Sequence, residues 1–293
     1  MHNGIATVER AIVSVLTQTW TDLELVVSDN GSTDGTEALC RRYAALDARI
    51  RYTRHPTLRG PLENFAFVLR EARAPYFMWL AADDYLLPTL LERAVEVLDH
   101  NPGVVCAVPR ARFVDPDGTT RPALGTFGLA GSLRENVCAF LHDPNDNSRF
   151  YGVYRRPALL HVLPRSAYYG ADWTISVGTL LFGTHHELPE VLLVRETNDR
   201  GKYVRMIDTA FASAPSRLLP LLPFTRSLLA LRIPLSLCSV IELIRHNAGQ
   251  HVEYARYRYP RYGRVAHVVG ASVEKARRRL AVAVRTLRRG GAR

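Results

Sequence analysis

Four aspartates stand where the sequence predicts that a strand ends or a helix begins, and their carboxylates offer the clearest chemistry. Asp83 and Asp84 follow Tyr76 to Leu80, an apolar run typical of a strand buried on both faces. Adjacent carboxylates repel each other, and a divalent cation is the usual reason for a protein to tolerate the repulsion. The alternative is that both acids cap the helix expected near Pro88.

Asp29 and Asp172 occupy comparable positions. Asp29 follows the apolar run Leu23 to Ser28 and opens a turn-rich segment, whereas Asp172 precedes a helix expected over Trp173 to Phe182. In an open α/β sheet, ligands bind beyond the carboxyl ends of the strands, so acids placed there face a crevice. The alternatives are a plain turn residue at Asp29 and a helix N-cap at Asp172.

The elements that must position these acids alternate along the first 110 residues. This alternation predicts an α/β fold with a mostly parallel, doubly wound sheet. Beyond it, we predict strands at 150–154 and 188–194. Between residues 121 and 149 we predict a helix at 132–141, and the runs on either side of it, 121–131 and 143–149, suggest loops that form a mobile lid over the open edge of the sheet. The predicted helices begin near Val8 and cover 37–46, 61–72 and 88–100, and the predicted strands cover 23–28, 50–53, 76–80 and 104–108.

Composition limits the class of protein. The chain has 293 residues and a net charge of +10, carried by arginine because Lys202 and Lys275 are its only lysines. Such a balance suits acidic partners. Its four cysteines are scattered, which predicts buried thiols in a reducing compartment and therefore a cytoplasmic protein. The longest apolar region, Leu218 to Ile244, is broken by prolines and arginines, so we expect no transmembrane helix.

With these acids placed, the chain resembles the family 2 inverting glycosyltransferases of GT-A fold. The resemblance implies a Rossmann-like sheet flanked by helices over residues 1–200, with a nucleotide-sugar half at about 1–110 and an acceptor half at about 111–200. A helical, basic region, 201–293, follows it. The matching stretches are Ala11 to Trp20, Leu23 to Thr36, Gly60 with Asn64, Tyr76 to Asp84, Phe150 to Arg156 and Gly170 to Trp173.

The resemblance also implies an activity: inverting transfer of a glycosyl group from a nucleoside diphosphate sugar to a saccharide or lipid-linked acceptor, in cell-envelope polysaccharide or glycolipid synthesis. Mg²⁺ or Mn²⁺ bound by Asp83, with Asp84 beside it, would neutralise the departing diphosphate. Asp172 would take the proton of the acceptor hydroxyl. The residues implied to contact the nucleotide sugar are Asn3, Asp29, Asn30, Asp83 and Arg195.

The sequence departs from the family pattern at three points. Met1 to Gly4 begin where the usual first strand should finish, so we expect either a misplaced start codon or an incomplete donor site. Ala81 replaces the first acid of the usual Asp-x-Asp. Where relatives end in Arg-Arg-x-His, this chain reads Val194 to Asn198. Arg195 could then face the diphosphate, and the alternative is an arginine exposed to solvent.

The C-terminal segment suggests a membrane partner. Glu274 to Arg293 contains eight basic residues and one acid, and apolar residues at helical spacing form a stripe along it. This pattern is typical of a helix on an anionic membrane surface, here the inner face of the plasma membrane, and equally of one packed on the body of the protein. Two alternatives stay open: a non-catalytic relative that binds nucleotide sugars, and a peripheral membrane-binding protein. Nucleic acid is a poorer partner because the tail lacks interleaved aromatic residues.

Overall fold

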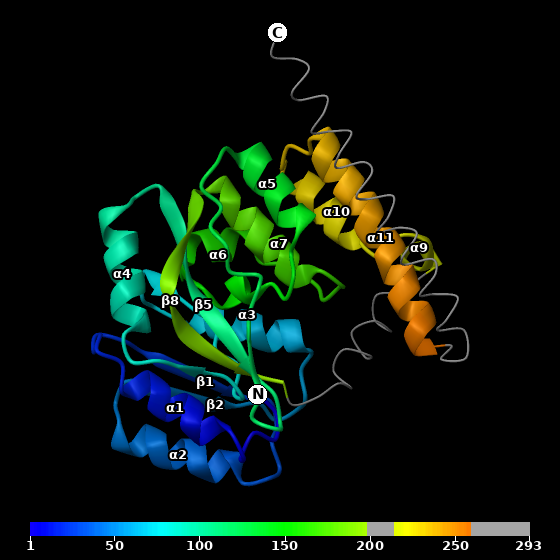
Figure 1. Cartoon of the computed structure of the whole chain (residues 1–293). Coiled ribbons are helices and arrows are strands. Elements are labelled where there is room, and N and C mark those ends of the chain that lie inside the picture. The colour runs from blue at the N-terminus through cyan, green and yellow to red at the C-terminus, as the bar shows by residue number, and fades with distance from the viewer. Residues whose placement is uncertain (198–213, 259–293) are drawn as a thin grey trace.

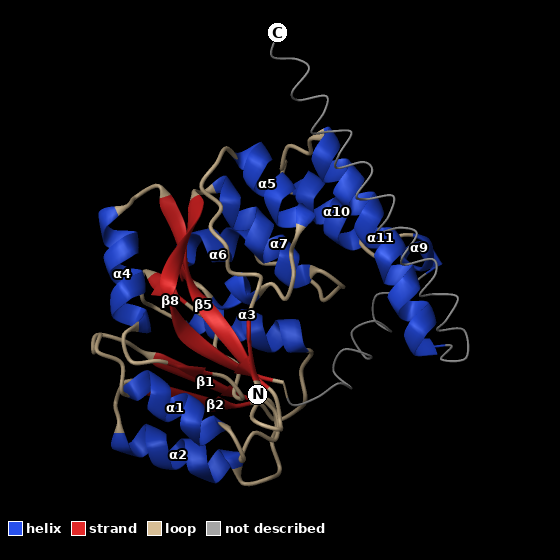
Figure 2. Cartoon of the chain, in the orientation of Figure 1, coloured by secondary structure: helices blue, strands red, loops and turns tan. Residues whose placement is uncertain are grey.

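Helices and strands alternate through the first part of the chain, and residues 214–258 form helices (Figures 1 and 2). The structure is a computed structural model that describes residues 1–197 and 214–258. Its α-helices are α1 Val8–Leu16, α2 Thr36–Leu46, α3 Pro61–Glu71, α4 Leu90–His100, α5 Leu133–His142, α6 Arg156–Val162, α7 Ala171–Gly178, α9 Ala214–Leu218, α10 Leu222–Ala230 and α11 Leu237–Arg258. Two 3-10 turns are η1 Ser148–Tyr151 and η2 Thr179–Leu181. The strands are β1 Leu25–Asp29, β2 Ile50–Arg54, β3 Tyr76–Phe77, β4 Tyr85–Leu86, β5 Val104–Val114, β6 Thr120–Pro122, β7 Val153–Arg155 and β8 Thr184–Glu196.

The strands form two sheets. β1 and β2 pair in parallel, and a second sheet runs in the order β3, β7, β5, β8, β4 with β6 beside β5. β5 and β8 are also parallel, and these two ladders, of five and ten residue pairs, are the longest, whereas the shorter pairings are antiparallel. The predicted α/β class with a mainly parallel, Rossmann-like core is therefore confirmed.

Apolar faces explain how the helices near the N-terminus cover β1 and β2. Val8, Ile12 and Val15 lie on one face of α1 at helical spacing and are buried. Val8 and Ile12 pack with Val27 of β1 and Ile50 of β2. Figure 1 shows α1 and α2 on one side of this pair of strands and α3 on the other. The two strands therefore end side by side, with their following loops at one edge.

The predicted strand Tyr76 to Leu80 is only partly correct. β3 ends at Phe77, because the backbone beyond it leaves the sheet as the Trp79 ring turns into the core. The indole of Trp79 stacks on Phe150 with ring centroids 4.6 Å apart, and its N–H donates to the carbonyl of Phe65 at 3.0 Å. The aromatic run therefore fills the core instead of extending the ladder.

Two predicted elements near the acceptor half need similar correction. The strand expected at 150–154 begins only at Val153, after the turn η1, and the helix expected over 173–182 is α7 followed by η2. The segment predicted as a lid is tied to the body. Arg149 N–H donates to the Gly125 carbonyl at 3.1 Å, and Leu129 pairs with His185. These bonds hold the turn before β7 in place.

The helices after residue 214 pack against the first part of the chain. Leu221, Phe224 and Leu228 share one buried cluster with Phe140 of α5 and Val177 of α7. Figure 1 shows α10 and α11 beside α5 and α7. The described part of the 201–293 region is thus helical, as predicted, while the domain boundary near residue 200 stays a prediction. The basic segment Glu274 to Arg293 lies outside the described residues.

The cysteine prediction is wrong for one pair. Cys138 of α5 and Cys238 of α11 form a disulfide with Cα atoms 5.9 Å apart, whereas Cys40 and Cys106 are buried thiols. Sequence spacing hid the pairing, because the two residues are 100 positions apart and meet only through packing of α11 on α5. Disulfides persist in oxidising surroundings. Because two of the four cysteines are paired, the cysteines no longer support the prediction of a reducing compartment.

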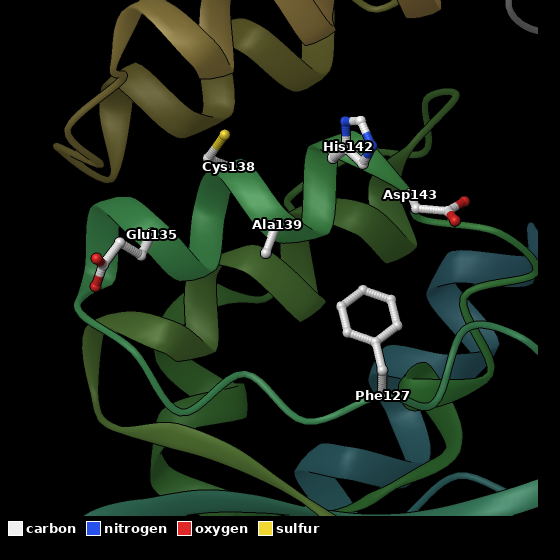
Figure 3. A pocket seen from close by; sticks show the side chains of 6 residues that line it. All are labelled: Phe127, Glu135, Cys138, Ala139, His142 and Asp143. Atoms are coloured by element: carbon white, nitrogen blue, oxygen red, sulfur yellow. The ribbon is translucent and has the colours of Figure 1, made fainter. Parts of the chain in front are cut away.

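A pocket lies beside this disulfide, under α5 (Figure 3). It encloses about 500 Å³, and Phe127, Glu135 and His142 are among its lining residues. None of the four aspartates singled out above lines it. Within the parts of the chain that the structure describes, no helix is both long enough and apolar enough to cross a bilayer.

Candidate active site

Asp29 ends β1 and organises the loop that follows it. Its side chain is fully buried: one oxygen accepts from Ser32 N–H at 2.9 Å and the other from the Tyr52 hydroxyl at 2.7 Å. Burial alone would raise the pKa of Asp29, but these hydrogen bonds outweigh it and hold the pKa below its usual value. The buried carboxylate is therefore ionised and fixes the course of residues 30–36.

Asn30 and Asn3 support the same loop. The Asn30 amide donates to the Arg59 carbonyl at 2.8 Å and accepts from Arg59 N–H at 2.7 Å. The side-chain oxygen of Asn3 accepts from Thr33 N–H at 2.9 Å. The structure thus brings together three of the five residues predicted to contact the nucleotide sugar, Asn3, Asp29 and Asn30, and the side-chain atoms that make these hydrogen bonds shape two loops at the exit of β1.

The amino terminus lies within the electrostatic range of both Asp29 and Asp83. The Met1 amino group donates to the Ser28 carbonyl at 2.9 Å. Its burial lowers its pKa, and the charges of Asp29 and Asp83 act in the opposite direction. The exit of β1 and the aspartate pair therefore face a common region.

Asp83 and Asp84 differ in exposure. Asp83 is half-buried, whereas Asp84 is only 3% exposed and accepts from Glu196 N–H at 3.0 Å. Burial raises the pKa of Asp84 to about 6, the Arg195 cation opposes that rise, and the charge of Asp83 adds to it. Neither aspartate caps α4, because Thr89 holds that position. The capping alternative is therefore wrong.

Arg195 links this pair to the acceptor half. Its Nε lies 3.4 Å from the Asp84 carboxylate, and its Nη1 donates to the Ser148 hydroxyl at 2.9 Å. The guanidinium sits between the rings of Phe113 and Tyr151, with its central carbon 4.9 and 4.5 Å from their centroids. These contacts fix the Arg195 side chain, so the alternative of an arginine exposed to solvent is wrong.

Asp172 lies in the first turn of α7. Gly170 is the N-cap, with φ 86°, so the N-cap alternative for Asp172 is wrong. The Asp172 carboxylate accepts from the Asn147 side-chain amide at 2.8 Å. Burial raises the pKa of Asp172, and the hydrogen bond from Asn147 counters part of that rise. A carboxylate whose pKa is moved toward neutrality suits a general base.

A continuous set of contacts joins the two groups of acids. It runs from Asp84 through Arg195 and Ser148 to Asn147, the neighbour of Ser148, and on to Asp172. Sequence reasoning missed Asn147 and Ser148 because their partners lie 25 and 47 positions away. Their only signal was the polar stretch before Phe150, which indicated a loop and nothing more.

Tyr151 lies within the electrostatic range of all these groups. Burial raises the pKa of Tyr151 to about 12, the charge of Arg195 opposes the rise, and the charges of Asp84, Asp83 and Asp172 add to it. All four charged groups therefore lie close enough to act on one phenol.

Asp83 and Asp84 fit a divalent cation that is bound jointly by the protein and by the phosphates of a substrate. Among the described residues, no group of three or more His, Cys, Asp or Glu side chains could hold a metal by themselves. Mg²⁺, however, usually keeps several waters and binds through one or two carboxylates together with substrate phosphates. The half-buried Asp83, with Asp84 behind it, meets that requirement once a diphosphate is present.

Part of the chain resembles known proteins. The sequence model of "Glycosyl transferase family 2" matches residues 1–163. Chondroitin synthase of Escherichia coli is 30% identical over 118 residues, which are 40% of this chain and 17% of that protein. An uncharacterized glycosyltransferase of Haemophilus influenzae is 27% identical over 101 residues, or 34% of this chain and 40% of that protein. The chain thus spans less than half the length of either relative.

Solved structures agree on the fold. TarS 1–349 of S. aureus in complex with UDP-GlcNAc gives a TM-score of 0.58 at 14% identity, over 95% of this chain and 90% of that one. Mannosyltransferase PcManGT of Pyrobaculum calidifontis, in complex with GDP-Man and Mn²⁺, gives 0.51 at 18% identity, over 96% and 81%. The likeness supports the GT-A-like architecture. Because the family model covers more than half of the sequence, the chain belongs to glycosyl transferase family 2.

Proposed function

We propose that this protein transfers a glycosyl group, with inversion, from a nucleoside diphosphate sugar to an acceptor hydroxyl. The observation that carries the proposal is the set of contacts that joins Asp84 and Arg195 to Asp172. At one end of this set, Arg195 supplies a positive charge for the diphosphate leaving group and Asp84 a carboxylate for a cation. The other end bears a carboxylate whose raised pKa suits proton removal. Family membership supports the same reaction class.

The acceptor side of the reaction depends on Asp172. Inversion requires the acceptor hydroxyl to attack the face opposite the leaving group, and a carboxylate beside that hydroxyl takes its proton as the new bond forms. The position of Asp172 at the start of α7 favours its ionised form, since a helix N-terminus stabilises negative charge. Asp172 is accordingly the proposed general base.

The donor side depends on the residues at the other end. Arg195 is held between two rings and offers a fixed positive charge toward the diphosphate. Asp83 and Asp84 would hold Mg²⁺ or Mn²⁺, and the bound cation would neutralise charge on the diphosphate. Asp29 and Asn30 act by fixing the loops at the exit of β1, so that backbone groups there contact the nucleoside.

The donor class rests on two structural neighbours with different nucleotides. TarS is in complex with UDP-GlcNAc and PcManGT with GDP-Man and Mn²⁺, so a nucleoside diphosphate sugar is the shared chemistry. Because one curated relative is a chondroitin synthase, a polysaccharide or glycolipid of the cell envelope is the proposed product. The stereochemical outcome tests the proposal. NMR of the first-formed product should show an anomeric configuration opposite to that of the donor, and retention of configuration would overturn it.

A membrane-facing surface is a second proposal, favoured by α9 to α11. Leu218, Val240 and Ile244 line an apolar groove of about 400 Å³ and are 76%, 41% and 65% exposed. Residues 214–258 contain six arginines and two glutamates. Exposed apolar side chains within a basic segment suit an anionic bilayer. The wild type should sediment with phosphatidylglycerol vesicles but not with phosphatidylcholine vesicles, and Ile244→Glu should sediment less with the former. Equal sedimentation of the wild type and Ile244→Glu would exclude this surface.

A further inference from the structure

Asn147 is a buried asparagine whose two amide atoms have different partners. Its side chain is 3% exposed, its Nδ2 donates to Asp172 at 2.8 Å, and its Oδ1 accepts from the Ser176 hydroxyl at 3.0 Å. Because the oxygen faces the hydroxyl, the NH₂ group must face the carboxylate. A flipped amide would place its oxygen against the Asp172 carboxylate, which is repulsive. The orientation is therefore determined by both neighbours.

The backbone around Asn147 is equally constrained. Its φ is 45°, a left-handed conformation that asparagine tolerates better than most residues. Its N–H donates to the Pro144 carbonyl at 2.9 Å, and its carbonyl accepts from Phe150 N–H at 3.0 Å. A Cβ on Gly125 would lie 2.7 Å from the Asn147 nitrogen, so only glycine permits this close packing. The turn presents the amide to Asp172 in one position.

We propose that Asn147 is the positioning residue for the catalytic carboxylate, holding one oxygen of Asp172 so that another lone pair points to the acceptor hydroxyl. The inference rests on the proposed function, in which Asp172 is the base. An ionised carboxylate has about four lone-pair sites, so one hydrogen bond leaves others for the acceptor proton. Ser176 acts one step further out, by fixing the orientation of the Asn147 amide.

The bond from Asn147 also favours the ionised form of Asp172. Among residues 1–197 and 214–258, the charged or titratable groups that act on this carboxylate include Arg195 of β8, Tyr151 of η1 and Tyr168, which precedes α7. The cation of Arg195 supports ionisation of Asp172, whereas the two partly buried phenols are neutral and carry no charge that would support it. The Asn147 hydrogen bond counters part of the rise in the Asp172 pKa that burial causes. Without the amide the pKa of Asp172 rises further, so the base is ionised only at higher pH.

A matched pair of variants tests this inference. Asn147 and Asn145 both have positive φ, 45° and 48°, but Asn145 is exposed and its amide lies 3.3 Å from the carbonyls of Leu124 and Asp143. Glycine adopts this conformation at either position without strain. Asn147→Gly removes the amide from Asp172, whereas Asn145→Gly makes the same chemical change two residues away. Asn147→Asp keeps the shape and places a second acid against Asp172.

Two readouts are measured. The first is titration of the Asp172 carboxyl by ¹³C NMR, assigned by its loss in Asp172→Asn. The second is the pH dependence of nucleoside diphosphate release from UDP-GlcNAc and GDP-mannose with Mn²⁺. Asn147→Gly should raise the pKa of Asp172 by about one unit, the usual worth of one hydrogen bond. It should also lower kcat roughly 10- to 100-fold, as misplacement of a reacting group does, with donor KM nearly unchanged. Asn147→Asp should raise the pKa further, and Asn145→Gly should match the wild type.

The outcomes separate the inference from the function beneath it. An unmoved carboxyl titration in Asn147→Gly, or an equal shift in Asn145→Gly, overturns the positioning role. If Asp172→Asn keeps full activity, the base assignment fails and the inference fails with it. If Asp172→Asn is inactive while Asn147→Gly keeps the wild-type pH profile, only the inference fails. Circular dichroism of each variant excludes a fold defect as the cause.

Discussion

The Arg195 guanidinium lies 3.4 Å from the carboxylate of Asp84, across 111 positions of sequence, and both side chains are largely buried, at 17% and 4% exposure. Removing one member of such a pair leaves the other charge without its partner in a poorly solvated place. We expect Arg195→Met to lower the free energy of unfolding by about 3 kcal/mol, measured by urea denaturation.

The exposed ion pair of Arg93 with Glu190 provides the control. Its side chains are 43% and 44% exposed, so Arg93→Met should cost less than about 1 kcal/mol. The double variant Arg195→Met with Asp84→Asn should recover part of the loss, since no buried charge is then left alone. Equal losses in the two arginine variants would contradict the buried pairing.

Asp172→Asn tests the proposed base. The change keeps the shape of the side chain but removes its ability to accept a proton, so transfer should fall by about 10²- to 10⁴-fold while donor affinity stays the same. Glycosyl transfer and donor binding are measured on the same preparations. Asp117→Asn, in the exposed turn between β5 and β6, is expected to behave as the wild type. Wild-type turnover by Asp172→Asn would require another base.

The disulfide between Cys138 and Cys238 should stabilise the packing of α11 on α5. It closes a loop of 100 positions, so its reduction should lower the free energy of unfolding by roughly 2 to 5 kcal/mol. Urea denaturation with and without dithiothreitol measures the loss. Cys138→Ala should lose similar stability and show no further response to the reductant. Four reactive thiols in the unreduced, unfolded wild type would contradict the pairing.

His246 should make stability depend on pH. Its Nε2 lies 2.7 Å from the Leu141 carbonyl, its ring packs on Trp173, and burial together with the charge of Arg245 lowers its pKa from 6.5 to about 4. Between these values the unfolded chain binds a proton that the folded chain does not. The contribution of neutral His246 to the free energy of unfolding is therefore complete above pH 6.5 and is lost as the pH falls toward 4.

The expected loss from His246 is at most about 3 kcal/mol over that window, from the size of the pKa change. His246→Gln should flatten the dependence of unfolding free energy on pH between 4 and 6.5. The exposed His100 at the end of α4 supplies a control, and His100→Gln should leave the slope unchanged. An identical slope in His246→Gln and the wild type would refute the assignment.

Local patterns were sufficient for much of the fold. The apolar face of α1 and the polar loop after Asp29 are properties of short segments, so periodicity and turn chemistry predicted them. Asp29, Asp84 and Asp172 could be selected because each stands at an element boundary. Asp29 ends the parallel strand β1, Asp84 immediately precedes β4 and Asp172 lies in the first turn of α7, so each boundary could be recognised from a short local pattern.

Contacts between distant segments could not be predicted in the same way. Three such contacts depend on how helices and strands pack together, and no pattern within a short segment predicts that packing. They join Asn147 to Asp172, Arg195 to Asp84 and Cys138 to Cys238. Trp79 shows a related limit: an aromatic run favours a strand, but the indole packs on Phe150 and the ladder ends at Phe77. Tertiary packing overrode propensity there.

Donor binding tests the central claim most directly. The melting temperature is measured with UDP-GlcNAc, UDP-glucose, GDP-mannose and dTDP-rhamnose, each with and without Mn²⁺, for the wild type, Asp83→Asn and the control Asp117→Asn. A ligand that binds only the folded state raises the melting temperature with its concentration over Kd. We predict a Mn²⁺-dependent rise for one nucleotide class in the wild type and Asp117→Asn, and a smaller rise in Asp83→Asn. No rise with any donor would contradict the glycosyltransferase proposal, and a full rise in Asp83→Asn would place the metal elsewhere.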